Sequence, residues 1–357
     1  MSEHQENNAQ KLSQKLANFT VHFSLKAAPA KVLDNAKLAI LDCLGVAVLA
    51  AAQEIGVNLL KFASANASAG CCTVWGTDRT ASPRDAALIN GTLAHGLDYD
   101  DRNHSTTYTL AASVAVAEQQ NLSGAKMLEA FIVGREVRNS LDALFGRRSD
   151  GIGPGAKGWH SNGILGPIAA ACSASRALSL SAPETRAAIG LAAGSCGALT
   201  RDGGTMAKPF RTGHAAATGL TCALLAHSGF SSDDTAIEGR FGLLEALGPI
   251  PDTIVASLAH ELGTKFHLEN DNRIKPYASC TATHNGLEAM LRLARGHDIR
   301  AESVETIECD QKPYPLVRQI PQRGYEGRFS MAYCLALALV HRVQVLGRER
   351  VALAAGE

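Results

Sequence analysis

The segment Ala94–His104 holds the densest group of chemically active side chains, with three aspartates and two histidines. Asp98 and Arg102 are four positions apart and would share one face of a helix if the preceding helix continued through them. Carboxylates at this density are typical ligands of a hard metal ion. The alternative is an acidic helix end exposed to water. The spacing alone leaves both interpretations open.

A second candidate, His160, lies in the glycine-flanked segment Gly158–Gly163. A single histidine in such a loop is more often a hydrogen-bonded structural residue than a catalyst. The preceding Gly151–Gly155 has the glycines of a phosphate-binding loop, but it follows no predicted strand and Pro154 lacks an N–H donor. We therefore keep His160 as a candidate and discard the phosphate loop.

Two lysines lie at irregular positions beside prolines. Lys208 follows a glycine pair and directly precedes Pro209, and Lys275 directly precedes Pro276. A lysine in such a setting can bind a carboxylate, or act as a base if it is desolvated. The flanks of Lys208 are apolar residues or glycine, which favours a site role over a place on the surface.

Helices must position these candidates, because Ala- and Leu-rich stretches with helical spacing dominate residues 11–241. Helix starts are indicated at Ser82, Ser123 and Ser181, and a proline follows Ser82 and Ser181 within two residues. Small residues are frequent in these stretches and let helix axes approach closely. Cys72–Trp75 is the early strand candidate.

The character of the sequence changes after Gly248–Pro251. A helix is predicted from about Thr283 to Arg295, and Ser303–Cys309 has the β-compatible residues of a strand. We therefore expect a mainly α protein with a large all-helical domain and a smaller α+β domain. The predicted boundaries are 11–262 and 265–345, and residues 1–10 and 346–357 are expected to be disordered.

Composition excludes several classes of protein. The 357 residues carry 34 Lys and Arg against 34 Asp and Glu, so the basic excess of a nucleic-acid binder is absent. No apolar stretch is long enough for a membrane span, and the polar N-terminus does not resemble a signal peptide. Nine cysteines without C-x-x-C spacing argue against a disulfide framework. A reduced, cytoplasmic protein is expected.

Five motifs, taken in order, resemble the MmgE/PrpD family of 2-methylcitrate dehydratases, cis-aconitate decarboxylases and iminodisuccinate epimerases. The matching stretches are Asn90–Asp101, Gly158–Ser161, Gly204–Ala216, Lys275–Cys280 and Arg328–Cys334. No single motif is decisive, but five in family order are specific. The resemblance extends from about residue 12 to about residue 340.

The resemblance implies an active site between a helical domain and a lid, a homodimer, and reactions on small di- and tricarboxylates without metal or organic cofactor. Two lysines would stabilise the charge that develops on a substrate carboxylate while a nearby His or Asp moves the proton. Carried over by position, the site residues are Asp98, His160, Lys208, Lys275 and Tyr333. We expect Asp98, His160, Lys208 and Tyr333 to be catalytic, and Arg102, His104, Tyr108 and Lys275 to bind the substrate.

Two positions depart from the family pattern, with Arg102 where the family has Thr and Tyr108 where it has His. An ion pair between Arg102 and Asp98 would make Asp98 a poorer proton acceptor. Alternatively, Arg102 would bind a second substrate carboxylate. Tyr108 is a weaker acid than a protonated histidine. We therefore expect a poor methylcitrate dehydratase that prefers another polycarboxylate.

The function predicted from the sequence is that of a lyase that dehydrates or decarboxylates a small di- or tricarboxylate. The first alternative is an epimerase or isomerase, which exchanges a proton at the same carbon without a leaving group. The second is a truncated, inactive family member, because the chain ends soon after Tyr333 and residues 343–357 do not resemble the family. Such a chain is expected to be less stable than a full-length member.

Overall fold

The computed structural model describes residues 12–145, 153–248, 250–270, 274–310 and 320–341. Its α-helices are α2 (Leu12–His22), α3 (Ala30–Ala51), α4 (Glu54–Asn66), α5 (Pro83–His95), α6 (Ser105–Gln119), α7 (Gly124–Leu141), α8 (Ser161–Ala177), α9 (Ala182–Gly194), α10 (Ala207–His227), α11 (Leu243–Leu247), α12 (Asp252–Glu261), α13 (His284–Gly296), α14 (Gly324–Gly327) and α15 (Met331–His341). Its short 3₁₀ helices are η1 (Leu25–Ala27), η2 (Asp142–Phe145), η3 (Pro154–Lys157), η4 (Thr200–Asp202), η5 (His267–Glu269), η6 (Thr281–Thr283) and η7 (Ala301–Ser303). Strands β1 (Cys72–Thr73) and β2 (Thr80–Ala81) pair antiparallel.

The mainly α class is confirmed, and its helices begin where the sequence indicates. Ser82 accepts a hydrogen bond from the third residue of α5, and Ser123 does the same at the start of α7. Ser181 and Glu184 form a reciprocal capping box at the start of α9. Each cap satisfies an N–H group that the helix itself cannot pair, so local chemistry fixes these starts.

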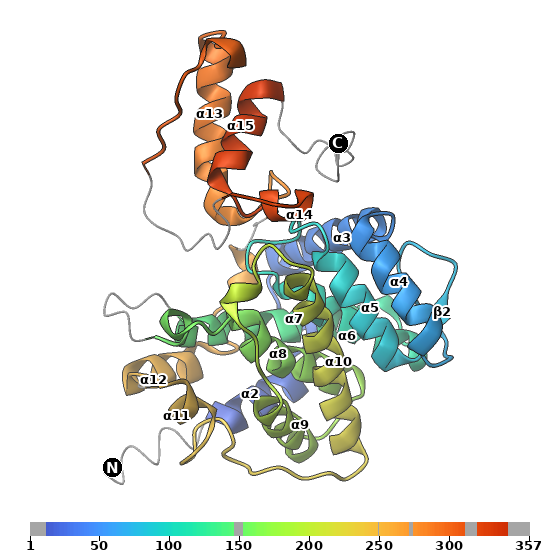
Figure 1. The fold of residues 1–357 in the computed structure, drawn as a ribbon. Coiled ribbons are helices and arrows are strands. Elements are labelled where there is room, and N and C mark those ends of the chain that lie inside the picture. Colours follow the sequence, from blue (N-terminus) through green and yellow to red (C-terminus); the bar gives the residue numbers. More distant parts are fainter. Residues whose placement is uncertain (1–11, 146–152, 249, 271–273, 311–319, 342–357) are drawn as a thin grey trace.

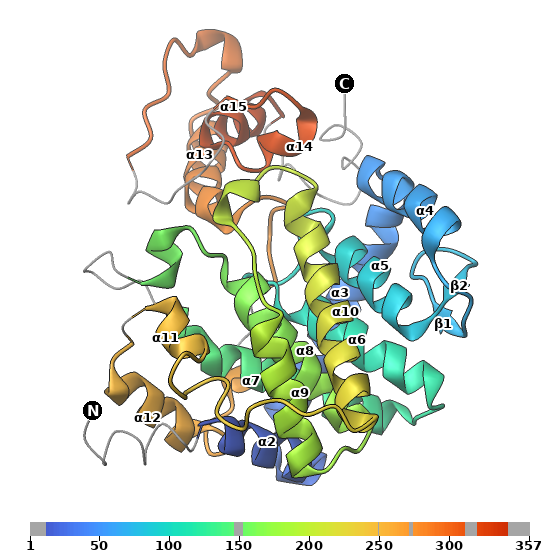
Figure 2. The ribbon, with the colours of Figure 1, turned by 60° about the horizontal axis from the view of Figure 1, so that its bottom comes forward.

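Glycines bring the central helices into close contact. A Cβ added at Gly213 of α10 would lie 2.0 Å from the Leu88 carbonyl oxygen of α5, and one at Gly219 would lie 2.5 Å from the Pro167 carbonyl oxygen of α8. Figure 2 shows α8, α9 and α10 side by side in the body. As a result of this packing, the C-terminal end of α5 lies against the N-terminal end of α10.

A second, smaller core lies apart from the main one. Tyr277, Leu287, Leu291, Cys334 and Ala338 form a buried apolar cluster between α13 and α15. Both views show this helix pair side by side, projecting from the helical body (Figures 1 and 2). The predicted helix at Thr283–Arg295 is thus confirmed as α13.

The strand predicted at Ser303–Cys309 is wrong. Ser303 ends the short helix η7, and residues 304–310 form no strand. Most of these side chains are exposed, and no other described segment pairs with this one. A run of β-compatible residues becomes a strand only when a neighbouring strand completes its hydrogen bonds. The strand predicted at Cys72–Trp75 is confirmed in part, because β1 covers Cys72–Thr73.

Two of the sequence predictions concern residues that lie wholly or partly outside the described ones. The predicted tails, 1–10 and 346–357, are wholly outside, as are parts of the predicted 265–345 domain. Its boundaries and those of the 11–262 domain stay predictions. Within the described residues, no single helix is both long and apolar enough to cross a membrane, and the bent pair α3 and α4 meets that test only when taken together.

Candidate active site

The loop between α5 and α6 carries the acidic motif. Helix α5 ends at His95, so the helix that would place Arg102 one turn from Asp98 does not continue. Asp98 and His104 instead have φ angles of +51° and +61°, in the left-handed region. This loop turns the Asp98 side chain into the protein, where it is fully buried, while Arg102 is exposed.

Asp101 fixes the shape of this loop. Its carboxylate accepts hydrogen bonds from the backbone N–H groups of Asn103 at 3.1 Å, Ser105 at 3.2 Å and Thr106 at 2.8 Å. Arg135 of α7 donates to the same carboxylate from Nη1 at 2.7 Å. A carboxylate at the start of α6 satisfies unpaired N–H groups and faces the positive end of the helix dipole. Asp101 is therefore a structural anchor.

Asp98 lies between two lysines from distant parts of the chain. Lys208, in the first turn of α10, pairs with Asp98 Oδ1. Lys275 places its Nζ 3.1 Å from Asp98 Oδ2 and donates to the Asp98 carbonyl oxygen at 2.7 Å. All three side chains are buried. The structure thus brings together three of the residues singled out in the sequence.

Two histidines complete the cluster around Lys208. The Lys208 Nζ lies 2.9 Å from His95 Nε2 and 3.5 Å from His104 Nε2. Asp100 contacts both rings on their other side, at 2.7 Å from His95 Nδ1 and 2.9 Å from His104 Nδ1. In the neutral tautomer set by Asp100, each Nδ1–H donates to the carboxylate and each Nε2 offers a lone pair to the ammonium group. Asp100 therefore orients both rings toward Lys208.

The charges of the cluster follow from burial and contact. Burial alone would raise the pKa of Asp98, but Lys208 and Lys275 lower it well below its usual range. Burial lowers the pKa of His95 to about 3, even though Asp100 opposes the shift, and it also lowers the pKa of His104. At neutral pH, the cluster therefore holds ionised carboxylates, ammonium groups and neutral imidazoles.

Arg102 and Tyr108 do not contact this cluster. Arg102 forms no ion pair with Asp98, because the helix ends before it and its side chain is exposed. Tyr108 is fully buried in α6, beside Gly166 of α8. Burial raises the pKa of Tyr108, which disfavours its phenolate form. The proposed ion pair between Arg102 and Asp98 is wrong, and a substrate-binding role for either residue stays a prediction.

Neither His160 nor Tyr333 has a described hydrogen bond or ion pair with the cluster. His160 precedes α8, and its Nδ1 accepts a hydrogen bond from the Asn162 N–H at 3.3 Å. Burial and then the charges of Lys208 and Arg211 lower the pKa of His160 well below its usual range. The Tyr333 ring of α15 lies against Gly327. No described hydrogen bond joins either side chain to Asp98 or Lys208.

Several residues of this neighbourhood were not selected from the sequence. His95 and Asp100 lie inside the Asn90–Asp101 motif, where the sequence indicates no role for them beyond possible metal ligands. Burial, with the nearby charges of Asp100 and Asp101, raises the pKa of Asp42 to about 7. Asp42 carried no motif at all. Its position in the apolar helix α3 gave no signal, since only the fold places it near the acidic loop.

The three aspartates of the acidic loop are buried, so its interpretation as an acidic helix end exposed to water is wrong. The possible metal ligands are His95, Asp98, Asp100 and His104, whose ligand atoms lie within 4.8 Å of one another. Lys208 and Lys275 already neutralise Asp98. A divalent cation there would lie against two ammonium groups, which is electrostatically unfavourable. The residues fit their own lysines better than a metal, and a metal-free site stays our prediction.

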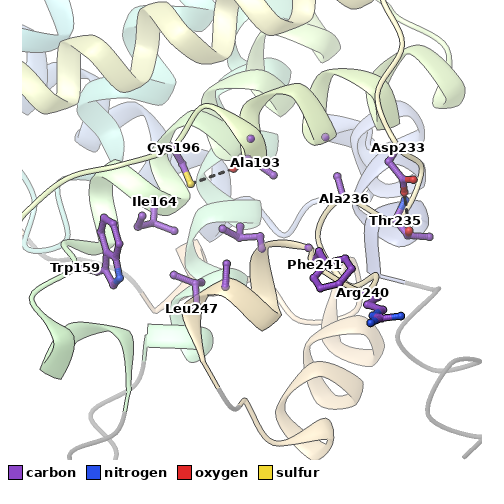
Figure 3. A pocket seen from close by; sticks show the side chains of 15 residues that line it. Trp159, Ile164, Ala193, Cys196, Asp233, Thr235, Ala236, Arg240, Phe241 and Leu247 are labelled. Carbon is purple, nitrogen blue, oxygen red and sulfur yellow. Dashed lines mark hydrogen bonds between the residues drawn. The ribbon is translucent and has the colours of Figure 1, made fainter. Parts of the chain in front are cut away.

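A cavity of about 530 Å³ lies beside Trp159, away from the cluster. Figure 3 shows it between Trp159, Ala193 and the segment that carries Asp233 and Arg240. Cys196 lines it and donates to the Ala193 carbonyl oxygen at 3.1 Å. Most of its lining residues are apolar. The buried cluster, with two lysines, is therefore the better candidate for anion chemistry.

Comparisons with known proteins point to one family. The model of the MmgE/PrpD N-terminal domain matches residues 14–254. The cis-aconitate decarboxylase-like protein oryM of Aspergillus oryzae is 28% identical over 364 residues, which cover 91% of this chain and 73% of that protein. Cis-aconitate decarboxylase of Aspergillus terreus is 28% identical over 348 residues, with 90% and 70% covered. The human cis-aconitate decarboxylase is 31% identical over 227 residues, which cover 60% of this chain and 46% of that protein.

Proposed function

Since the chain belongs to the MmgE/PrpD family, we propose that it is a lyase that removes carbon dioxide from a small unsaturated tricarboxylate of the cis-aconitate type. The names of the two fungal relatives, which match 91% and 90% of this chain, favour decarboxylation over dehydration. The resemblance seen in the five sequence motifs agrees with this choice. Family membership itself is shown, and the reaction is our proposal.

The buried Asp98–Lys208–Lys275 group is the observation that carries the proposal. Two ammonium groups lie on either side of one carboxylate in a site with little access to water. Charged groups act more strongly there than at the surface because the local dielectric constant is low. A substrate carboxylate that reaches this site would exchange contacts with Asp98 and share the two lysines.

The reaction requires one proton and a place for negative charge. When carbon dioxide leaves, the electron pair of the broken C–C bond forms a new double bond with the next carbon. The original double bond shifts its electrons to its far carbon, which takes up a proton. Lys208 can supply that proton from its ammonium group, which is held between His95 and Asp98, and it takes up a proton from solvent after the product has left. Lys275 remains as the cation that holds a carboxylate.

The experiment is an assay of the purified protein with cis-aconitate, in which carbon dioxide release and loss of the starting double bond are followed together. Lys208→Ala tests the site, and Lys37→Ala is the control because the Lys37 side chain is 65% exposed and distant in sequence. We expect turnover in wild type and control and its loss in Lys208→Ala. Carbon dioxide release that is equal in all three proteins, or absent in the wild type, would refute the proposal.

The same preparation tests the alternatives. Dehydration is followed with 2-methylcitrate, and epimerisation is followed by exchange of the proton next to a carboxylate in deuterated water. An inactive chain would turn over none of these acids. The homodimer that the family resemblance implies and the cytoplasmic location expected from composition stay proposals, and sedimentation analysis of the purified chain tests the first.

A further inference from the structure

The segment that contains α14 lies beside the buried cluster. The Phe329 ring centroid lies 5.1 Å from the Lys208 Nζ. The Arg328 carbonyl oxygen accepts a hydrogen bond from the Cys280 N–H at 2.9 Å, which ties this segment to the loop that follows Lys275. Tyr325 lies close enough for the charges of Asp98 and Asp100 to act on its hydroxyl. This segment therefore lines the cluster, although it is more than 100 residues away from Lys208 in the sequence.

Arg328 is a buried cation without a carboxylate partner among the described residues. Arg328 is only 7% exposed, and its Nε has no hydrogen-bond partner. The guanidinium carbon lies 4.9 Å from the ring centroid of Tyr325, whose buried hydroxyl has no described partner other than Arg328. A buried charge with an unpaired donor and no carboxylate beside it is costly unless an anion compensates it. This pair of side chains therefore indicates a missing anionic ligand.

The other buried arginines make the contrast clear. Arg135 pairs with Asp101 at 2.7 Å, and Arg138 pairs with Asp142 at 2.7 Å. Arg211 pairs with Asp202 at 2.6 Å. Arg135 and Arg138 also leave their Nε unpaired, so the difference is the carboxylate, which Arg328 lacks among the described residues.

The charge of the cluster points in the same direction. Asp98 and Asp100 are balanced by Lys208 and Lys275, and the histidines are neutral, so these groups sum to zero. A tricarboxylate brings three negative charges to this balanced group. Arg102 is also without a described carboxylate but is exposed, so Arg328 is the buried cation near the cluster that pairs with no described carboxylate.

We propose that Arg328, supported by the Tyr325 hydroxyl, binds one carboxylate of the substrate and so selects tricarboxylates over dicarboxylates. The planar guanidinium can bind a carboxylate through two parallel hydrogen bonds while it stacks on the Tyr325 ring. The tyrosine hydroxyl can donate a further hydrogen bond to the same group. This inference rests on the proposed function for the identity of the anion, but its test measures binding alone.

The experiment compares binding of tricarballylate, a saturated tricarboxylate that cannot react in the same way, with binding of two smaller acids. Glutarate lacks the central carboxylate, and methylsuccinate lacks one terminal carboxylate. Titration calorimetry is applied to the wild type, Arg328→Gln, Arg328→Lys and the control Arg323→Gln. Arg323 lies five positions earlier in the same segment and is exposed. Thermal melts of all four proteins confirm that each is folded.

We expect Arg328→Gln to bind tricarballylate about tenfold more weakly, as for loss of a charge-assisted hydrogen bond, with partial rescue in Arg328→Lys and no change in Arg323→Gln. For the dicarboxylate that lacks the carboxylate held by Arg328, wild type and Arg328→Gln should bind equally. Equal binding of tricarballylate by wild type and Arg328→Gln, an equal loss for all three acids, or no binding by the wild type would overturn the inference. A wild type that binds tricarballylate but releases no carbon dioxide would refute the decarboxylase proposal alone.

Discussion

Removal of the Lys208 ammonium group is the most direct test of the buried cluster. In the wild type this group pairs with Asp98 and lies 2.9 Å from His95 Nε2. Lys208→Ala takes away a cation that would stabilise negative charge on the substrate, a loss of about 2–4 kcal/mol in the transition state. The turnover number should therefore fall by a factor of about 30 to 1,000. The protein should still fold, because Lys275 remains paired with Asp98.

The acid stability of the same variant gives a second measurement. The lowered pKa of Asp98 in the folded state adds stability that is present above the unfolded pKa, near 3.9, and is lost as the pH falls through the folded-state pKa. Lys208→Ala removes one of the two charges that lower this pKa. Unfolding by acid should therefore begin at a higher pH in Lys208→Ala than in the wild type.

The assay measures initial rates with cis-aconitate and unfolding by circular dichroism from neutral to acid pH, with Lys37→Ala as the matched control. Lys208→Arg, which keeps the charge, should retain more of the wild-type turnover number than Lys208→Ala. A turnover number in Lys208→Ala within about twofold of the wild type would remove Lys208 from the chemistry. An unchanged acid transition would show that its charge does not act on Asp98.

Three further outcomes are expected. Because the pKa of Asp42 is raised to about 7, the stability of the wild type should fall as the pH rises from about 4 to 7. Asp42→Asn should flatten this pH dependence in thermal melts recorded at several pH values. A pH dependence equal to that of the wild type would contradict this expectation. Arg135→Met leaves Asp101 without its buried partner and should lower the free energy of unfolding, measured in urea, by about 3–5 kcal/mol. A loss below about 1 kcal/mol would mean that this ion pair does not stabilise the fold. Gly213→Ala places a methyl group against the Leu88 carbonyl oxygen and should lower the free energy of unfolding by about 1–3 kcal/mol, and an unchanged urea midpoint would show that the two helices can separate.

Features of the fold that depend on neighbouring residues in the chain could be predicted from the sequence. Ser82, Ser123 and Ser181 cap the helices that were expected to follow them, because a cap needs only a side-chain oxygen and the next few N–H groups. Ser303–Cys309 failed as a strand because strand formation depends on a partner elsewhere in the chain. Local propensity gave no information on that partner.

The site was predictable only in part, for a related reason. Asp98, Lys208 and Lys275 were selected from their motifs, and the fold brings them into contact. The pairing of Asp98 with Arg102 failed because α5 ends at His95, a point that the following glycine, Gly96, could have indicated. Arg328 lay in a recognised motif, but its lack of a partner is a property of the packed structure.

The left-handed backbone at Asp98 and His104 limits how this enzyme could be made more robust. An L-residue other than glycine in this conformation carries a strain of about 1–3 kcal/mol, which the surrounding contacts must offset. Glycine at either position would relieve the strain and would remove a carboxylate or an imidazole from the cluster. At Asp98 this gain is outweighed, because glycine would leave Lys208 and Lys275 as buried cations without their carboxylate. Mutant libraries screened only for heat resistance should therefore enrich glycine at His104 and not at Asp98, and the enriched proteins would lack one imidazole of the cluster.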